Sequence, residues 1–281
     1  MKKFFKSLFC VIIMICALIL PSSCRKYNAT DYYIALKSQV LTDATKYKYI
    51  TFNKTVVDKE TKNEDHSEIR YYSNASSDGA TMFSGVEISD SHLIAVTNTN
   101  TYDMRVIVKP IFSESGDGIA ISSVDIYNEV INENGIATDT YVKTESTEEK
   151  YREIVSSIKA DLYSTYKNSV KTVADATFID EASSKKNTDG YTIVYHDAND
   201  VKYTANLSRL TTYWTKDNGF FGSVSAWTKK EYVITKLVAE TESAVTTVTW
   251  SIAYFTNESI KAPDATKIVE GKPIEIDDYI K

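Results

Sequence analysis

Strand-like segments fill most of this sequence and are interrupted once by a long stretch with helical periodicity. The 281 residues include 20 tyrosines and only four prolines, and β-branched and aromatic residues favour strands. Polar turn residues separate the segments, so the pattern predicts a meander of antiparallel strands. The expected strands are 46–57, 67–73, 81–88, 92–98, 104–112, 118–131, 191–197, 201–207, 209–216, 223–229, 230–240 and 244–255.

Two helices are expected. The long one covers residues 147–173, where Ser146 and Glu149 match a capping box. Its apolar residues recur at helical spacing: Tyr151, Ile154, Val155, Ile158, Leu162, Tyr166, Val170 and Val173. The shorter one covers residues 30–43, with Thr30 as its N-cap and Tyr33, Leu36 and Val40 on one stripe. Both helices would lay one face on the sheet.

The N-terminus has the pattern of an export signal. Residues 1–6 carry three lysines and no acid, and residues 8–20, LFCVIIMICALIL, carry no charge. Thirteen apolar residues are short for a spanning helix, which needs about 20. The pattern is typical of a signal peptide, which we place at residues 1–23.

Cys24 follows this segment directly, after Pro21, Ser22 and Ser23. Small residues before a cysteine resemble the lipobox of bacterial lipoproteins, although that pattern usually has Leu where Pro21 stands. The resemblance implies cleavage before Cys24, acylation with fatty acids such as palmitate, and attachment to the extracytoplasmic face of the cell membrane. The alternatives are cleavage by the ordinary signal peptidase near Ser23 or an uncleaved anchor. Cys10 and Cys16 lie in the apolar run, so processing leaves Cys24 as the one cysteine.

The remaining chain divides into a lipidated cysteine with its tether (24–30), a single antiparallel-sheet domain (31–263) and a C-terminal extension (264–281). Residues 1–23 hold three of the 32 basic residues and none of the 38 acidic ones, so the rest has a net charge of −9. This acidic balance argues against nucleic acid as a partner and against electrostatic docking on anionic lipid.

Catalytic and metal-binding motifs are absent from the sequence. His66, His92 and His196 are isolated, and zinc, calcium, P-loop and nucleophile-elbow spacings do not occur. The run from His196 to Asp200 could bind a cation, but it reads more simply as a polar hairpin turn. We therefore expect no enzyme activity, no metal and no cofactor.

The order of elements resembles the LolA-like and LppX/LprG-like lipoproteins. The features that carry the resemblance are a helix directly after the tether, a strand meander interrupted by the 147–173 helix, and the late run TTVTWSIAYFTNESIKAP at 246–263. The resemblance implies an α+β, β-dominated fold: a curved antiparallel sheet, or half-barrel, packed on an N-terminal helix and a long middle helix. It also implies an apolar cavity that binds a lipid or another hydrophobic ligand.

Periodicity alone selects the residues that would line such a cavity: Tyr151, Ile154, Ile158, Leu162, Trp250, Ile252 and Tyr254. The same residues would equally fill a packed core. A second functional hypothesis is a surface interaction module, such as an adhesin or an accessory subunit of an envelope complex, because Tyr and Trp are favoured at protein contacts. The sequence identifies no protein partner.

Overall fold

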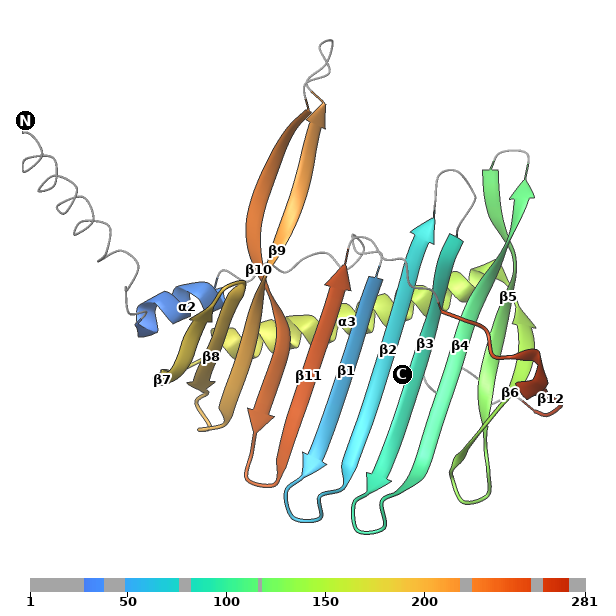
Figure 1. Cartoon of the computed structure of the whole chain (residues 1–281), viewed down its shortest axis with the longest axis horizontal. Coiled ribbons are helices and arrows are strands. Elements are labelled where there is room, and N and C mark those ends of the chain that lie inside the picture. Colours follow the sequence, from blue (N-terminus) through green and yellow to red (C-terminus); the bar gives the residue numbers. More distant parts are fainter. Residues whose placement is uncertain are drawn as a thin grey trace, which may run out of the picture.

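The computed structural model describes residues 28–37, 49–75, 82–115, 118–217, 224–253 and 260–272. Within these residues, twelve strands form one sheet accompanied by two α-helices (Figure 1). The elements are α2 (Ala29–Lys37), β1 (Tyr49–Asp58), β2 (Glu64–Ala75), β3 (Met82–Ile94), β4 (Thr99–Ser115), β5 (Gly118–Ile131), β6 (Ala137–Ser146), α3 (Glu148–Ala174), β7 (Phe178–Asn187), β8 (Gly190–His196), β9 (Lys202–Asp217), β10 (Val224–Glu240), β11 (Ala244–Ala253), the 3-10 helix η3 (Ala265–Lys267) and β12 (Ile268–Val269).

The sheet consists of two strand meanders joined at its centre. Its order is β12-β6-β5-β4-β3-β2-β1-β11-β10-β9-β8-β7. Strands β1 to β6 follow one another outward to one edge, and β7 to β11 return from the other edge. β11 pairs antiparallel with β1 from Asp58 opposite Ala244 to Tyr49 opposite Ala253. We call this pairing the β1–β11 seam.

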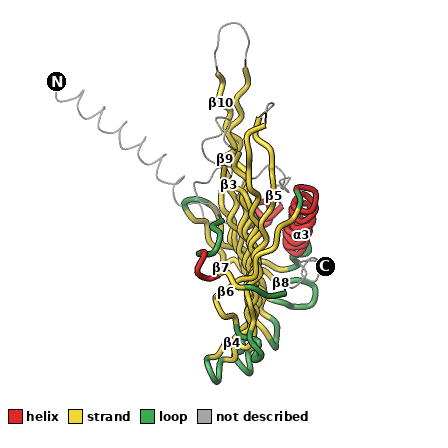
Figure 2. The backbone as a smooth tube through the Cα atoms, turned by 90° about the vertical axis from the view of Figure 1, so that its right-hand side faces the viewer, coloured by secondary structure: helices red, strands yellow, loops and turns green. Residues whose placement is uncertain are grey.

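Helix α3 connects the two meanders. It carries the chain from β6 to β7, which lie ten strand intervals apart, or about 48 Å at the usual spacing. The 27 residues of α3 span about 40 Å. The helix therefore runs across the strands rather than along them, behind the sheet in Figure 1 and on one side of it in Figure 2.

The contacts of α3 follow the strand order. Near its start, the Tyr151 hydroxyl lies 2.7 Å from that of Ser84 on β3. Further along, the Lys159 ammonium lies 4.8 Å from the ring centroid of Tyr71 on β2. Past the seam, the Tyr166 ring meets Trp250 of β11 edge-on, with centroids 5.3 Å apart. The apolar stripe that defines the helix in the sequence thus meets several strands in turn.

The main core lies between α3 and the sheet, on what we call the helix face. Alternate residues of each strand reach it, so Ile50 and Phe52 of β1 are buried there while Thr51 points to the opposite, outer face. Helix α2 adds Tyr32 and Leu36 to the same core.

A second, smaller core lies on the outer face, where the C-terminal segment crosses the sheet (Figure 1). Its buried members are Tyr72, Ile107, Tyr127, Tyr141 and Ile260. Ile260 is 3% exposed and packs beside Gly85, where a Cβ would come within 2.8 Å of the carbonyl oxygen of Val108. Beyond η3, β12 adds to the sheet parallel to β6. Part of the expected C-terminal extension is therefore bound to the sheet.

The predicted fold class is confirmed. The structure is α+β and β-dominated, with a curved, unclosed antiparallel sheet, an N-terminal helix and a long middle helix. The long helix begins and ends within one residue of the predicted bounds.

Both predicted helix caps were wrong. The Thr147 hydroxyl, and not that of Ser146, accepts a hydrogen bond from the backbone amide of Lys150 at 3.2 Å. At α2, Asn28 rather than Thr30 is the cap, because its side chain accepts from the Asp31 amide at 3.1 Å while the Asp31 carboxylate accepts from the Asn28 amide at 3.2 Å. This reciprocal pair is a capping box.

Several strand bounds also differ from the prediction. The strand predicted at 92–98 is the end of β3 followed by a turn, in which Val96 is 87% exposed and Asn98 has a φ of 48°. β9 and β10 are each one strand where the sequence predicted two. β6 and β7 were missed because they lie near the sheet edges, where few of their residues are buried and the apolar alternation is weak.

Removing the hydroxyl of Tyr166 should destabilise the fold, because this oxygen accepts a hydrogen bond from the buried backbone amide of Ile234 at 3.1 Å. Tyr166→Phe leaves that N–H without a partner, and we expect unfolding free energy to fall by about 1–3 kcal/mol in urea titration. Tyr163→Phe is the matched control, since Tyr163 is 37% exposed on the same helix. Equal stability of the two variants would contradict this role.

Candidate functional site

Five of the seven predicted ligand residues lie together between α3 and the sheet. Tyr151, Ile154, Ile158, Leu162 and Trp250 all belong to the main core, and none is more than 7% exposed. The four residues on α3 pack in the core against the sheet, and Trp250 of β11 packs there against α3. A ligand at this position would therefore require α3 to separate from the sheet.

The other two predicted ligand residues are not described in the same detail. Ile252 is placed on β11 by its pairing with Ile50, and its side chain is outside the described set. Tyr254 and the predicted lipidation site Cys24 lie outside the described residues. Among the residues that are described, no helix is both long and apolar enough to cross a membrane.

Burial controls the chemistry of the tyrosines under α3. It raises the pKa of Tyr151 to about 12, against a smaller opposing effect of the hydrogen bond with Ser84. It also raises the pKa of Tyr166 to about 12, and the amide of Ile234 partly opposes this. Both rings are therefore neutral at physiological pH and act as hydrogen-bonding core residues, not as acids or bases.

Two buried polar groups of the core have no hydrogen-bond partner among the described residues: the Trp250 indole nitrogen and the Tyr195 hydroxyl. Trp250 is 4% exposed, and its ring packs on Phe52 with centroids 4.7 Å apart. An unpaired buried polar group costs about 1–3 kcal/mol. A hydrogen bond between either of these two atoms and a water molecule or a polar ligand group would remove that cost.

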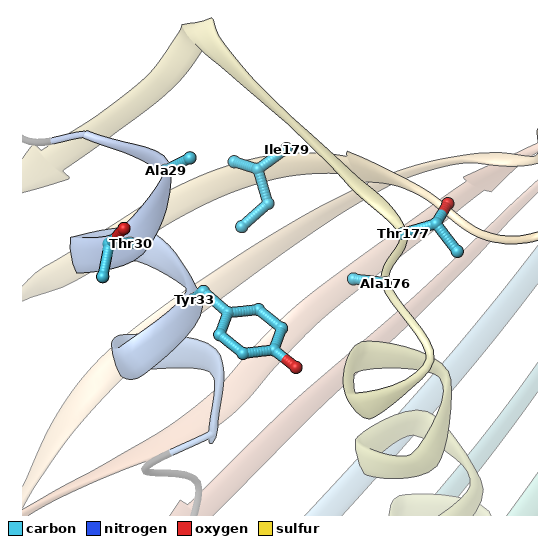
Figure 3. A pocket seen from close by; sticks show the side chains of 6 residues that line it. All are labelled: Ala29, Thr30, Tyr33, Ala176, Thr177 and Ile179. Atoms are coloured by element: carbon cyan, nitrogen blue, oxygen red, sulfur yellow. The ribbon is translucent and has the colours of Figure 1, made fainter.

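A pocket of about 260 Å³ opens between α2 and the junction of α3 with β7 (Figure 3). Its lining combines polar and apolar surface in similar amounts. The Tyr33 ring lies between α2 and the end of α3, and Ile179 points toward α2. The lining residues are Ala29, Thr30, Tyr33, Ala176, Thr177 and Ile179. This volume is below the range of about 300–1,000 Å³ typical of drug-sized ligands.

The wall formed by α2 is held to the edge strand β7 by two hydrogen bonds. The Tyr32 hydroxyl donates to the carbonyl of Ser184 at 2.9 Å. The amide of Ala29 donates to the Glu181 carboxylate, also at 2.9 Å. The pocket therefore lies at the β7 end of the sheet, and its first lining residue is the fifth after Cys24.

The outer face carries a charged cluster across β2, β3 and β4. The nearly buried Glu87 carboxylate accepts from Arg105 Nε at 2.5 Å and lies 3.8 Å from Arg70. Arg105 reaches on to the Tyr141 hydroxyl at 3.3 Å. Nearby, buried Asp125 pairs with Lys143 at 2.9 Å. In each ion pair the positive charge neutralises the carboxylate. The cluster therefore links neighbouring strands, and the carboxylates of Glu87 and Asp125 are both paired.

A polar pocket of about 330 Å³ lies at the ends of β3, β4 and β5, lined in part by Asp90, Asp103, Arg105 and Glu129. Burial raises the pKa of Glu129, partly offset by the amide of Asp139. Within the described ranges, no group of three or more His, Cys, Asp or Glu residues could hold a metal ion.

The run from His196 to Asp200 forms the polar turn that the sequence favoured. The Asp197 carboxylate accepts from the amides of Asn199 at 2.8 Å and Val201 at 3.0 Å. His196 Nδ1 lies 2.8 Å from the Asp200 carboxylate. The lone pairs of Asp197 are thus engaged in closing the turn between β8 and β9.

Sequence reasoning missed the α2 pocket. Ala29 is more than a hundred residues away from Ala176 and Ile179 in the sequence, and the lining residues carry no motif. The available signal was the predicted pair of helices, since the end of one and the start of the other would meet if both lay on the same face of the sheet. The periodicity did not give their relative position.

Stability should decline at high pH because Tyr151 and Tyr166 ionise less readily in the folded chain than in the unfolded one. With folded pKa values of about 12 against about 10 when unfolded, their contribution is complete below pH 10 and is lost between about pH 10 and pH 12. Urea unfolding at a series of pH values, with tyrosinate absorbance, measures this. Tyr151→Phe should flatten the decline and Tyr163→Phe should not; a decline equal in both variants would contradict it.

Comparison with models of known protein families and with curated protein sequences finds no match for this chain.

Proposed function

We propose that this chain is a membrane-anchored extracytoplasmic lipoprotein that binds a lipid or another hydrophobic ligand. The observation that carries the proposal is the pocket between α2 and the end of α3, which has Tyr33 and Ile179 in its lining and begins five residues after Cys24. An acyl chain that leaves the membrane beside the anchor would meet this opening first. Hydrophobic contact with Tyr33 and Ile179 supports binding of its end.

The core beneath α3 supports a second stage of the same proposal. Helix α3, with α2 beside its end, covers the helix face, and the Trp250 indole and Tyr195 hydroxyl there are without partners among the described residues. A longer ligand that entered at α2 would extend along α3 toward Leu162 and Ile158 only if the helix moved away from the sheet. Such a ligand would replace side-chain contacts with its own apolar surface.

The anchor is tested by replacing Cys24. The motivating observation is that Cys24 directly follows a 13-residue apolar run and is the one cysteine after it. Cys24→Ala should move the protein from the membrane fraction to the medium or leave an uncleaved precursor, because two or more acyl chains give stable attachment and none would remain. Fractionation and intact mass measure this. Membrane attachment with an unchanged mass would remove the anchor from the proposal.

Ligand binding is tested with a fluorescent fatty acid. We expect saturable binding to the wild-type protein and a loss of roughly tenfold or more in affinity for Ala29→Trp, which fills the pocket. Ile34→Trp is the matched control, because Ile34 lies on the same helix and is 60% exposed. Wild-type protein that does not bind the probe, or two variants that bind it as the wild type does, would contradict the pocket.

A surface interaction module is the second candidate, favoured by the outer face of the β1–β11 seam. There the pairs Thr51–Ser251, Asn53–Thr249 and Thr55–Thr247 place hydroxyl and amide groups side by side. Such a face suits hydrogen bonding to a protein or glycan. Failure of the fatty-acid probe, with saturable binding of a glycan or protein, would favour this function.

A further inference from the structure

The strands β9 and β10 continue beyond the rest of the sheet as a two-stranded ribbon (Figure 1). Pairing of β9 with β8 ends at Ser208, and pairing of β10 with β11 ends at Lys236. Beyond these points, residues 209–217 pair only with residues 224–232 among the described strands. A bulge between Ile234 and Lys236 marks the place where the ribbon leaves the sheet, as bulges bend and twist a strand.

The residues of the ribbon suit an interface between water and lipid. Register places Trp214 directly opposite Trp227, so two of the three tryptophans of the chain form one cross-strand pair. On the same face, the pairs Lys216–Ser225 and Thr212–Lys229 stand on either side of it. Tryptophan flanked by lysine is the composition of membrane interfaces.

The ribbon is basic although the chain is acidic. Residues 209–217 and 224–232 include Arg209, Lys216, Lys229 and Lys230 against Asp217 and Glu231, a net charge of +2, while the whole chain has −6. The overall charge argues against attraction to anionic lipid, but this attraction decays within about 8–10 Å. The charge of the projecting ribbon therefore decides whether it is attracted.

The base of the ribbon lies close to the start of α2. The Tyr32 ring on α2 meets Tyr191 of β8 with centroids 6.4 Å apart, and Tyr191 meets Tyr232 of β10 at 5.3 Å. Asn28 is four residues after Cys24 in the sequence, a reach of at most about 14 Å. If Cys24 carries the lipid, the membrane surface lies near the end of the sheet from which the ribbon projects.

We propose that the β9–β10 ribbon docks on an anionic membrane surface, with the Trp214–Trp227 pair at the level of the lipid headgroups. The placement of that membrane rests on the proposed anchor at Cys24. An isolated two-stranded hairpin is only marginally stable in water. Contact of both strands with a membrane surface would therefore stabilise a ribbon that has no third strand. The ribbon and the lipid on Cys24 would be two points of attachment, and they would bring the α2 pocket to the bilayer.

The test uses the full-length protein in phosphatidylcholine vesicles with and without phosphatidylserine, in which part of the acyl chains are brominated to quench tryptophan fluorescence. Wild-type fluorescence should be quenched, more strongly with phosphatidylserine. Trp214→Phe/Trp227→Phe should lose most of the quenching, because the remaining Trp250 is 4% exposed in the core. Thermal unfolding of this variant checks that it still folds, since the proposal assigns the pair no place in the core.

Charge reversal supplies the matched control. Lys229→Glu/Lys230→Glu should reduce quenching in phosphatidylserine vesicles to the level in pure phosphatidylcholine, because the docking equilibrium weakens by roughly tenfold or more. Lys59→Glu/Lys62→Glu, in the exposed turn between β1 and β2 at the opposite end of the strands, should change nothing (Figure 1). Equal effects of the two charge variants would overturn the proposal.

The ribbon and the anchor fail in different ways. Vesicle flotation of the wild type against Cys24→Ala reports the anchor alone. Wild-type protein that floats while its tryptophans stay unquenched keeps the anchor and removes ribbon docking. Wild-type protein that does not float, but whose tryptophans are quenched when anionic vesicles are added, keeps the ribbon and removes the anchor.

Discussion

The crossing of the sheet by α3 is the constraint on which the rest of this structure depends. The first meander ends near one edge of the sheet and the second begins at the opposite edge, and the chain passes from one to the other through α3. A helix of 27 residues nearly matches that distance and buries one stripe of side chains over successive strands. The core is therefore a band perpendicular to the strands, and the strand ends beyond it carry polar residues. The α2 pocket exists because α3 ends at the β7 edge and a second short helix lies beside that end.

The two faces of the sheet are stabilised differently. The helix face depends on apolar burial, with neutral tyrosines such as Tyr166 hydrogen-bonded to the backbone of a strand. The outer face depends on ion pairs around Glu87 and on the C-terminal segment, whose Ile260 covers the backbone at Gly85. Ion pairs with partly exposed partners contribute little singly. The outer face is therefore the less strongly held of the two, and its hydroxyl-bearing centre at the seam is covered by neither α2 nor α3.

The sequence predicted what local periodicity can encode. The stripe from Tyr151 to Val173 placed the long helix to within a residue at each end, and alternation located most strands. It did not show that β1 pairs with β11, because the partner of a strand is chosen by residues far away in the chain. It missed β6 and β7, whose exposed positions weaken the alternation. It selected Ile158, Leu162 and Trp250 as neighbours, and the structure places them in one core. It could not distinguish a packed core from a cavity there, since both present the same apolar side chains.

The β1–β11 seam has a consequence for how this chain folds. Asp58 and Ala244 are paired neighbours in the sheet but are far apart in the sequence, and contacts of this kind make folding slow. The residues of β1 to β6 are synthesised before those of β11. Until β11 pairs with it, β1 has one edge with unpaired backbone groups. Open edges of this kind recruit strands from other chains. β11, the last long strand to emerge, is therefore the strand that covers the edge of β1.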